Sequence, residues 1–186
     1  MSESPWPRKA VVIGGGPAGL MAAEMLANRG VSVDVFDAMA SVGRKFLLAG
    51  KGGMNLTHSE DEVAFLSRYY DREHALTPAL HAFGPLQLRE WARGLGVDTF
   101  VGTSGRVFPT DMKAAPLLRA WLHRLRQQGV RIHTRHRWQG WAENGALQFR
   151  APGGVCTFPT DALVLALGGA SWQRLGSDGA WVPWLV

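Results

Sequence analysis

The chain has 186 residues, of which 46% are hydrophobic and 19% charged, as in an ordinary globular protein with one core. The formal net charge of +5 fits a phosphate ligand and also nucleic acid, so charge alone does not decide between them. The single cysteine, Cys156, excludes an internal disulfide and the cysteine pair of a disulfide reductase. We find no signal-peptide pattern and no apolar run of membrane-spanning length, so we expect a cytoplasmic protein.

The first predicted elements form a strand–turn–helix–strand unit. Ala10–Ile13 is a short apolar run typical of a buried parallel strand, and a glycine-rich turn follows it. Residues 20–29 are predicted to be a helix, and residues 31–36 a second strand that ends in Asp37. The unit has the length of a βαβ motif.

The middle of the chain is predicted to be less regular. Residues 38–59 are expected to form a long functional loop, because glycine and charged residues dominate them. Helices are predicted at 60–70, 79–95 and 113–128, with a short strand at 106–108 inside a loop.

Further strands are predicted in the last third. Residues 129–134 read as a third parallel strand, and segments near 137–142, 146–151 and 155–158 as an antiparallel meander. Residues 161–167 form the last predicted strand, and the tail 170–186 shows no clear element.

The turn after the first strand has the pattern of a dinucleotide-binding motif. Gly14 allows the tight turn, Gly16 lets the backbone approach a pyrophosphate, and Gly19 allows the helix to pack closely on the strand. Pro17 suits the first helical position, and the helix start from Pro17 and Ala18 presents free amides to phosphates. Asp37 is placed to accept hydrogen bonds from a ribose and to repel the 2′-phosphate of NADP.

The same motif serves NAD and FAD, and the rest of the chain favours FAD. An NAD dehydrogenase would continue to alternate strands and helices, whereas this chain has a glycine-rich loop and then a meander. We therefore predict an α/β fold, with a Rossmann-like parallel sheet of the glutathione-reductase FAD-binding type and a small antiparallel β-meander.

Three further segments of the sequence are distinctive: the loop GRKFLLAGKGGMNLT at 43–57, the segment GRVFP at 105–109, and LALGGASW at 165–172. These three landmarks resemble those of the YhiN/HI0933-type FAD-dependent flavoproteins, which include aminoacetone oxidase-like and BaiN-like NAD(P)/FAD-dependent oxidoreductases. The family usually has Arg-Cys where this chain has Gly53-Met54, so the chemistry of that cysteine does not carry over. Family members are roughly twice as long, so residues 1–186 are expected to be an incomplete FAD-binding domain. The inserted substrate domain and the C-terminal return to the flavin would be absent.

Further cofactor-binding residues are predicted within these landmarks and just after the third strand. Arg44 and Lys45 would neutralise the pyrophosphate, with solvated loop charges as the alternative. Asn55 and Thr57 would bind the flavin or ribityl chain, or cap the loop instead. The set is completed by Gly52 in the same loop, by Gly168 and Gly169, which would let the backbone approach the cofactor, and by Trp138, which would contact the adenine or fill the core.

Other chemistry is weakly supported by the sequence. Cys156 is expected to be buried, and neither the six histidines nor the acids show metal-ligand spacing. No Ser-His-Asp arrangement is visible, and no catalytic residue is predicted. The basic run from His123 to Arg137 could bind RNA, but a solvated helix and strand face is favoured.

The leading hypothesis is an FAD-dependent oxidoreductase of unknown small-molecule substrate, with NAD(P)H as a candidate electron donor. The alternatives are a non-catalytic nucleotide-binding module, an NAD-only dehydrogenase and, with less support, a flavin-dependent RNA-modifying enzyme. The sequence does not fix the oligomeric state.

Overall fold

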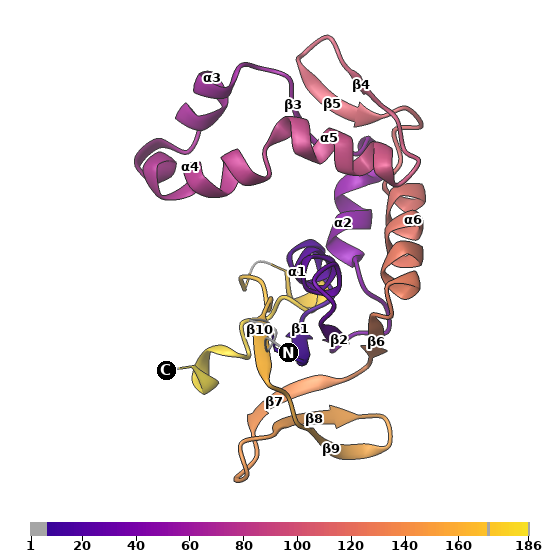
Figure 1. Cartoon of the computed structure of the whole chain (residues 1–186), viewed down its shortest axis with the longest axis vertical. Coiled ribbons are helices and arrows are strands. Elements are labelled where there is room, and N and C mark those ends of the chain that lie inside the picture. The colour runs from indigo at the N-terminus through magenta and orange to yellow at the C-terminus, as the bar shows by residue number, and fades with distance from the viewer. Residues whose placement is uncertain (1–6, 171, 186) are drawn as a thin grey trace, which may run out of the picture. The chain divides into compact units, whose positions relative to one another are not determined.

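The computed structural model describes residues 7–170 and 172–185 of the chain, which divides into two compact units (Figure 1). The first unit comprises Met1–Phe46 and His123–Val186, and the second comprises Leu47–Leu122. None of the helices in the described ranges is long and apolar enough to span a bilayer.

A four-stranded parallel sheet forms the centre of the first unit. Its strands are β1 (Lys9–Ile13), β2 (Ser32–Asp37), β6 (Arg131–Thr134) and β10 (Ala162–Leu165), in the order β10-β1-β2-β6. Helix α1 (Pro17–Ala27) connects β1 to β2. The apolar runs of β1 and β2 are almost wholly buried, which confirms the prediction of parallel strands.

The predicted meander is confirmed as β7 (Arg137–Trp141), β8 (Leu147–Ala151) and β9 (Gly154–Phe158). A cluster of buried side chains joins it to the parallel sheet, and Phe36 of β2 stacks on Phe149 of β8 at 4.2 Å between ring centroids. Cys156 is exposed, so the expectation that it is buried is wrong. It lies in β9, the outer strand of the meander, whose residues 154–157 are all exposed.

The second unit contains short helices and a three-stranded antiparallel sheet. Helix α2 (Arg44–Ala49) begins in the first unit and leads into the second, and α6 (Ala114–Gln127) leads back from the second unit into the first. Between them come the 3₁₀ turn η1 (Gly50–Gly52), β3 (Thr57–His58), α3 (Glu62–Ser67), η2 (Tyr70–Arg72), α4 (Glu73–Ala82), α5 (Pro85–Gly94), β4 (Thr99–Val101) and β5 (Arg106–Pro109). The sheet order is β3-β5-β4. Trp91 and Trp121 meet edge to face at 4.7 Å between ring centroids.

Two of the predicted elements are wrong in this region. Residues 38–59 are not one irregular loop, because they contain α2, η1 and β3. The predicted helix at 79–95 is two helices, since α4 begins at Glu73 and ends at Ala82, and α5 begins at Pro85. Pro85 has no N–H to continue α4, whereas its fixed backbone angle suits the first position of a new helix.

Backbone meets backbone where β1 turns into α1. A Cβ on Gly19 would lie 1.8 Å from the carbonyl oxygen of Gly14, and a Cβ on Gly14 would lie 2.2 Å from that of Ala166. Gly14 also has a φ of +109°, which other residues rarely adopt. The turn therefore holds α1 against β1 and against the segment that follows β10.

Gly19→Ala should lower the free energy of unfolding by about 3 kcal/mol or more, because the methyl group would overlap the Gly14 carbonyl. Gly16→Ala is the matched control in the same turn, since a Cβ there has no neighbour within 4 Å. Chemical denaturation of both variants checks this. Equal stabilities would show that the turn relaxes without cost.

A buried ion cluster joins β2 to β6. The Asp34 carboxylate, which is fully buried, accepts hydrogen bonds from Arg131 Nε at 2.8 Å, Arg131 Nη2 at 2.7 Å and His133 Nε2 at 2.7 Å. Burial opposes ionisation of Asp34, but the hydrogen bonds from Arg131 and His133 outweigh it and leave its pKa below the ordinary value.

The prediction that the basic run is a solvated face is wrong for several of its residues. His133 bonds to Asp34, Arg124 Nη1 lies 2.8 Å from the buried Glu24 carboxylate, and Arg137 Nη1 lies 2.9 Å from Asp178. These three side chains form ion pairs with acidic residues of the first unit.

Asp34→Asn should lower the free energy of unfolding at neutral pH by about 2 kcal/mol, because hydrogen bonds to a charged acceptor are lost. Since the folded-state pKa is lowered, this contribution is present above the ordinary pKa of 3.8 and is lost as the pH falls below it. Denaturation from pH 7 to pH 3 should show the difference from wild type shrinking. Asp71→Asn, whose side chain is 80% exposed, is the control. A difference in free energy of unfolding between wild type and Asp34→Asn that does not change with pH would contradict the assignment of Asp34 as an ionised acceptor.

Candidate functional site

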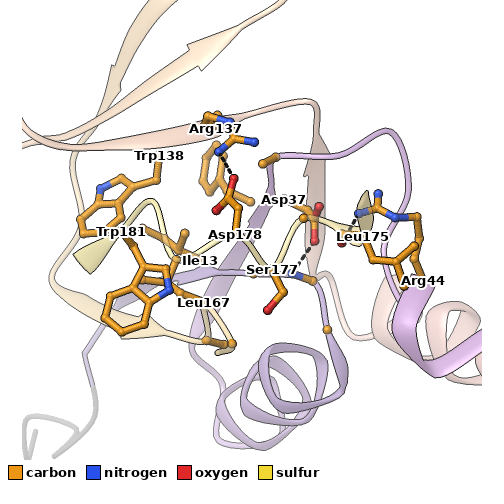
Figure 2. Close-up of a pocket in the computed structure, with 18 of the residues that line it drawn as sticks. Ile13, Asp37, Arg44, Arg137, Trp138, Leu167, Leu175, Ser177, Asp178 and Trp181 are labelled. Carbon is orange, nitrogen blue, oxygen red and sulfur yellow. Dashed lines mark hydrogen bonds and ion pairs between the residues drawn. The ribbon is translucent and has the colours of Figure 1, made fainter. Parts of the chain in front are cut away.

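A cavity of about 230 Å³ lies in the first unit, where β1, β2 and β10 end (Figure 2). Its walls come from residues 13–18 at the turn, from 36–38 at the end of β2, and from 41 and 43–45 beyond it. Residues 136–138 at the start of the meander and 166–168 after β10 also line it. Residues 175–178, 180, 181 and 184 of the tail complete it. The carboxyl edge of a parallel sheet is the usual ligand-binding place of such folds.

The beginning of α1 forms one wall of the cavity. Gly16 is the N-cap and has no side chain to occupy the helix start, Pro17 follows it, and no acidic residue lies in the first turn. The first amides of a helix lack partners within the helix and carry partial positive charge. Because the space at the Gly16 Cβ position is open, an anion can reach these amides.

Asp37 is fixed beside this turn. Its Oδ2 accepts a hydrogen bond from the Gly15 amide at 2.8 Å, and its Oδ1 accepts one from the Met39 amide at 2.8 Å. A carboxylate oxygen can accept more than one hydrogen bond, so both oxygens retain capacity for further donors. The side chain is half-buried and lines the cavity, where it can bind hydroxyl groups.

Two cations at the start of α2 also line the cavity. The Arg44 guanidinium donates to the carbonyl oxygens of Ser41, at 3.2 Å, and Leu175. Its Nε is buried without a hydrogen-bond partner among the described residues. The Lys45 Nζ lies 3.4 Å from the position that a Cβ on Gly168 would take. Two positive charges thus line the same cavity as the start of α1.

Tryptophan side chains form the wall opposite Arg44 (Figure 2). Trp138 is only 3% exposed, belongs to the core cluster, and meets Trp184 edge to face at 5.2 Å between ring centroids. It therefore both fills the core and lines the cavity. The ring nitrogens of Trp138 and Trp181 are buried without a hydrogen-bond partner in the described part of the chain.

The structure brings together most of the predicted site residues. Those that line the cavity are Gly14, Gly16, Pro17, Ala18, Asp37, Arg44, Lys45, Trp138 and Gly168. Gly19 packs behind the turn, and the Gly169 carbonyl accepts a hydrogen bond from Ser177. Gly52, Asn55 and Thr57 belong to the second unit, and their role in binding stays a prediction. Ser171, in the third landmark, lies outside the described residues.

Sequence reasoning missed the contribution of the tail. Arg137 and Asp178 form an ion pair at 2.9 Å on the cavity wall, and the hydrogen bond from Arg137 holds the pKa of Asp178 below its ordinary value. Ser177, Trp181 and Trp184 also line the cavity. The tail has no regular periodicity, so the only available signal was its density of tryptophan.

A second cavity, of about 300 Å³, lies within the second unit along α3, α4 and α5. Two acidic residues on its wall already have cationic partners, and a third, Asp61, accepts a hydrogen bond from the Ala64 amide. Glu60 is bound by Arg68 at 2.5 and 2.6 Å, and Glu62 lies 3.0 Å from His81. The first cavity, with buried donors that lack acceptors, is the stronger candidate for ligand binding.

Comparisons with known proteins identify the family of the chain. The profile of the HI0933-like protein Rossmann domain matches residues 8–186. The 3-dehydro-bile acid delta(4,6)-reductase of Clostridium scindens is 34% identical over 178 residues, which are 91% of this chain and 41% of that protein. The chain thus spans about two fifths of that relative's length.

Two further relatives cover less of the chain or are more distant in sequence. A ribosomal RNA dihydrouridine synthase of Haemophilus influenzae is 48% identical over 50 residues, which are 27% of this chain and 12% of that protein. The crystal structure of Thermovibrio ammonificans THI4 superposes with a TM-score of 0.58 at 17% identity, covering 93% of this chain and 62% of that one. This superposition supports the fold alone.

The family match covers almost the whole chain and confirms the resemblance that the three landmarks indicated. It also confirms the Rossmann-like fold and, for the family, FAD as the cofactor. The chain belongs to the HI0933-like family of FAD-binding flavoproteins.

Proposed function

We propose that the cavity of the first unit binds FAD, and that residues 1–186 form the FAD-binding domain of an oxidoreductase acting on a small molecule. One observation supports this proposal most strongly. The open N-terminus of α1 and the fixed carboxylate of Asp37 face the same cavity, as a nucleotide with a pyrophosphate and a ribose requires.

The residues of the cavity fit each part of a dinucleotide. The amides at the start of α1 would hold the pyrophosphate, and Arg44 and Lys45 would add positive charge. Asp37 would accept hydrogen bonds from the ribose hydroxyls and repel a 2′-phosphate. The buried Arg44 Nε, which lacks an acceptor among the described residues, is a donor that a bound anion can satisfy.

Bound FAD would supply the electron or hydride chemistry, and this chain would bind and orient it. Gly52, Asn55 and Thr57 of the second unit are proposed as further contacts to the flavin half. NAD(P)H as electron donor and a cytoplasmic location are also part of the proposal. A small-molecule substrate is supported by the bile acid reductase, which is named for such a substrate. A non-catalytic module would bind FAD without turning it over, and an NAD-only site would bind NAD in preference to FAD.

An RNA-modifying flavoenzyme is the second candidate, because one relative is named as a ribosomal RNA dihydrouridine synthase. Against it, Arg124 and Arg137 of the basic run already bind Glu24 and Asp178. Salt-dependent binding of ribosomal RNA fragments by the purified chain would favour this candidate.

Wild-type protein should bind FAD, and Gly16→Ala should weaken that binding at least about tenfold. The added methyl would occupy the place where the pyrophosphate approaches, while the unliganded fold has room for it. Calorimetric titration with FAD and with NAD, together with the flavin absorbance that stays with the protein after desalting, measures this.

Gly153→Ala is the matched control, because this hairpin glycine also has open space at its Cβ position and does not line the cavity. It should bind FAD as wild type does. If wild type stays colourless after incubation with FAD, the proposed function is wrong. Tighter binding of NAD than of FAD would favour an NAD-only site.

A further inference from the structure

The sheet order determines which side of the cavity each half of FAD would occupy. Asp37 follows β2, the start of α1 follows β1, and Leu167 and Gly168 follow β10. Because β1 lies between β10 and β2 in the sheet, the proposed pyrophosphate site at the start of α1 lies between Asp37 and the residues that follow β10. With the adenosine ribose at Asp37, the ribityl and isoalloxazine half extends toward β10. This step rests on the proposed function.

Trp181 lies on the β10 side of the cavity. Figure 2 shows its indole beside Ile13 and Leu167, across the cavity from Arg44. Its ring packs against the core cluster that includes Ile13 and Trp138. Its ring nitrogen is buried and has no acceptor among the described residues. A buried N–H without an acceptor costs free energy, which a ligand acceptor would recover.

The tail that carries Trp181 is tied to the cavity wall on both sides of this residue. Before it, the Leu175 carbonyl accepts from Arg44, and Asp178 pairs with Arg137 at 2.9 Å. After it, Trp184 meets Trp138 edge to face. These contacts hold the indole in place before any ligand binds, and a pre-positioned donor gives orientation at small entropic cost.

We propose that Trp181 is a flavin-positioning residue, whose indole N–H donates a hydrogen bond to an acceptor on the ribityl–isoalloxazine half of FAD. Trp138 has the same unpaired nitrogen, but its ring is held in the core between Trp141 and Trp184, at 5.0 and 5.2 Å between ring centroids. Trp181 is therefore the tryptophan that favours FAD and FMN, which contain a flavin, over ADP, which does not.

Fragment binding separates the two halves of the cofactor. Trp181→Phe keeps an aromatic ring and removes the N–H, so it should weaken binding of FAD and FMN by roughly fivefold and leave ADP unchanged. Trp172→Phe, a substitution in the same tail at a side chain that is 48% exposed and does not line the cavity, should change none of the three. Calorimetry with FAD, FMN and ADP measures the dissociation constants.

Indole NMR tests the proposal in the unaltered protein. The Trp181 Nε1–H resonance, assigned by its loss in Trp181→Phe, should shift on addition of FAD and FMN and stay in place with ADP. Unchanged FAD affinity in Trp181→Phe, or a loss that affects ADP and FAD equally, would overturn the assignment while leaving FAD binding itself intact. Failure of the wild-type protein to bind FAD would instead refute the proposed function.

Discussion

The turn between β1 and α1 keeps its shape only because three backbone segments are in direct contact there, with no side chains between them. Gly19 packs on the carbonyl of Gly14, and Gly14 packs on that of Ala166, beyond the end of β10. This contact aims the start of α1 at the carboxyl edge of the sheet and brings the segment after β10 alongside it. A side chain at either glycine would push apart the elements that form the cavity.

The same contact explains how distant parts of the chain meet at one place. Once β10 lies beside β1, the residues after β10 must pass the cavity, and the tail packs back against the meander. The ion pair between Arg137 and Asp178 and the bond from Arg44 to Leu175 fasten it there. The tail thereby adds aromatic and hydrogen-bonding groups that the βαβ unit alone does not have.

Local patterns were enough to predict the parallel strands, the meander and the glycine turn, because each carries its signal within a few residues. Asp37 could be placed at the cavity for the same reason, since it ends a strand next to that turn. The sequence did not reveal Trp181 or Asp178, because they reach the cavity through long-range packing in a segment without periodicity. Short elements such as β3 and β4 were missed because they exist only through pairing with β5. Cys156 was misjudged because a strand pattern does not show which strand lies at the edge of a sheet.

The account depends on an anion binding to bare amides at the beginning of α1. A crystal structure of the chain with FAD tests this most directly. The account predicts density for the diphosphate within hydrogen-bonding distance of the backbone amides that follow Gly16, with the adenosine ribose at Asp37. Density for the diphosphate elsewhere, with this helix start contacting only solvent, would contradict it.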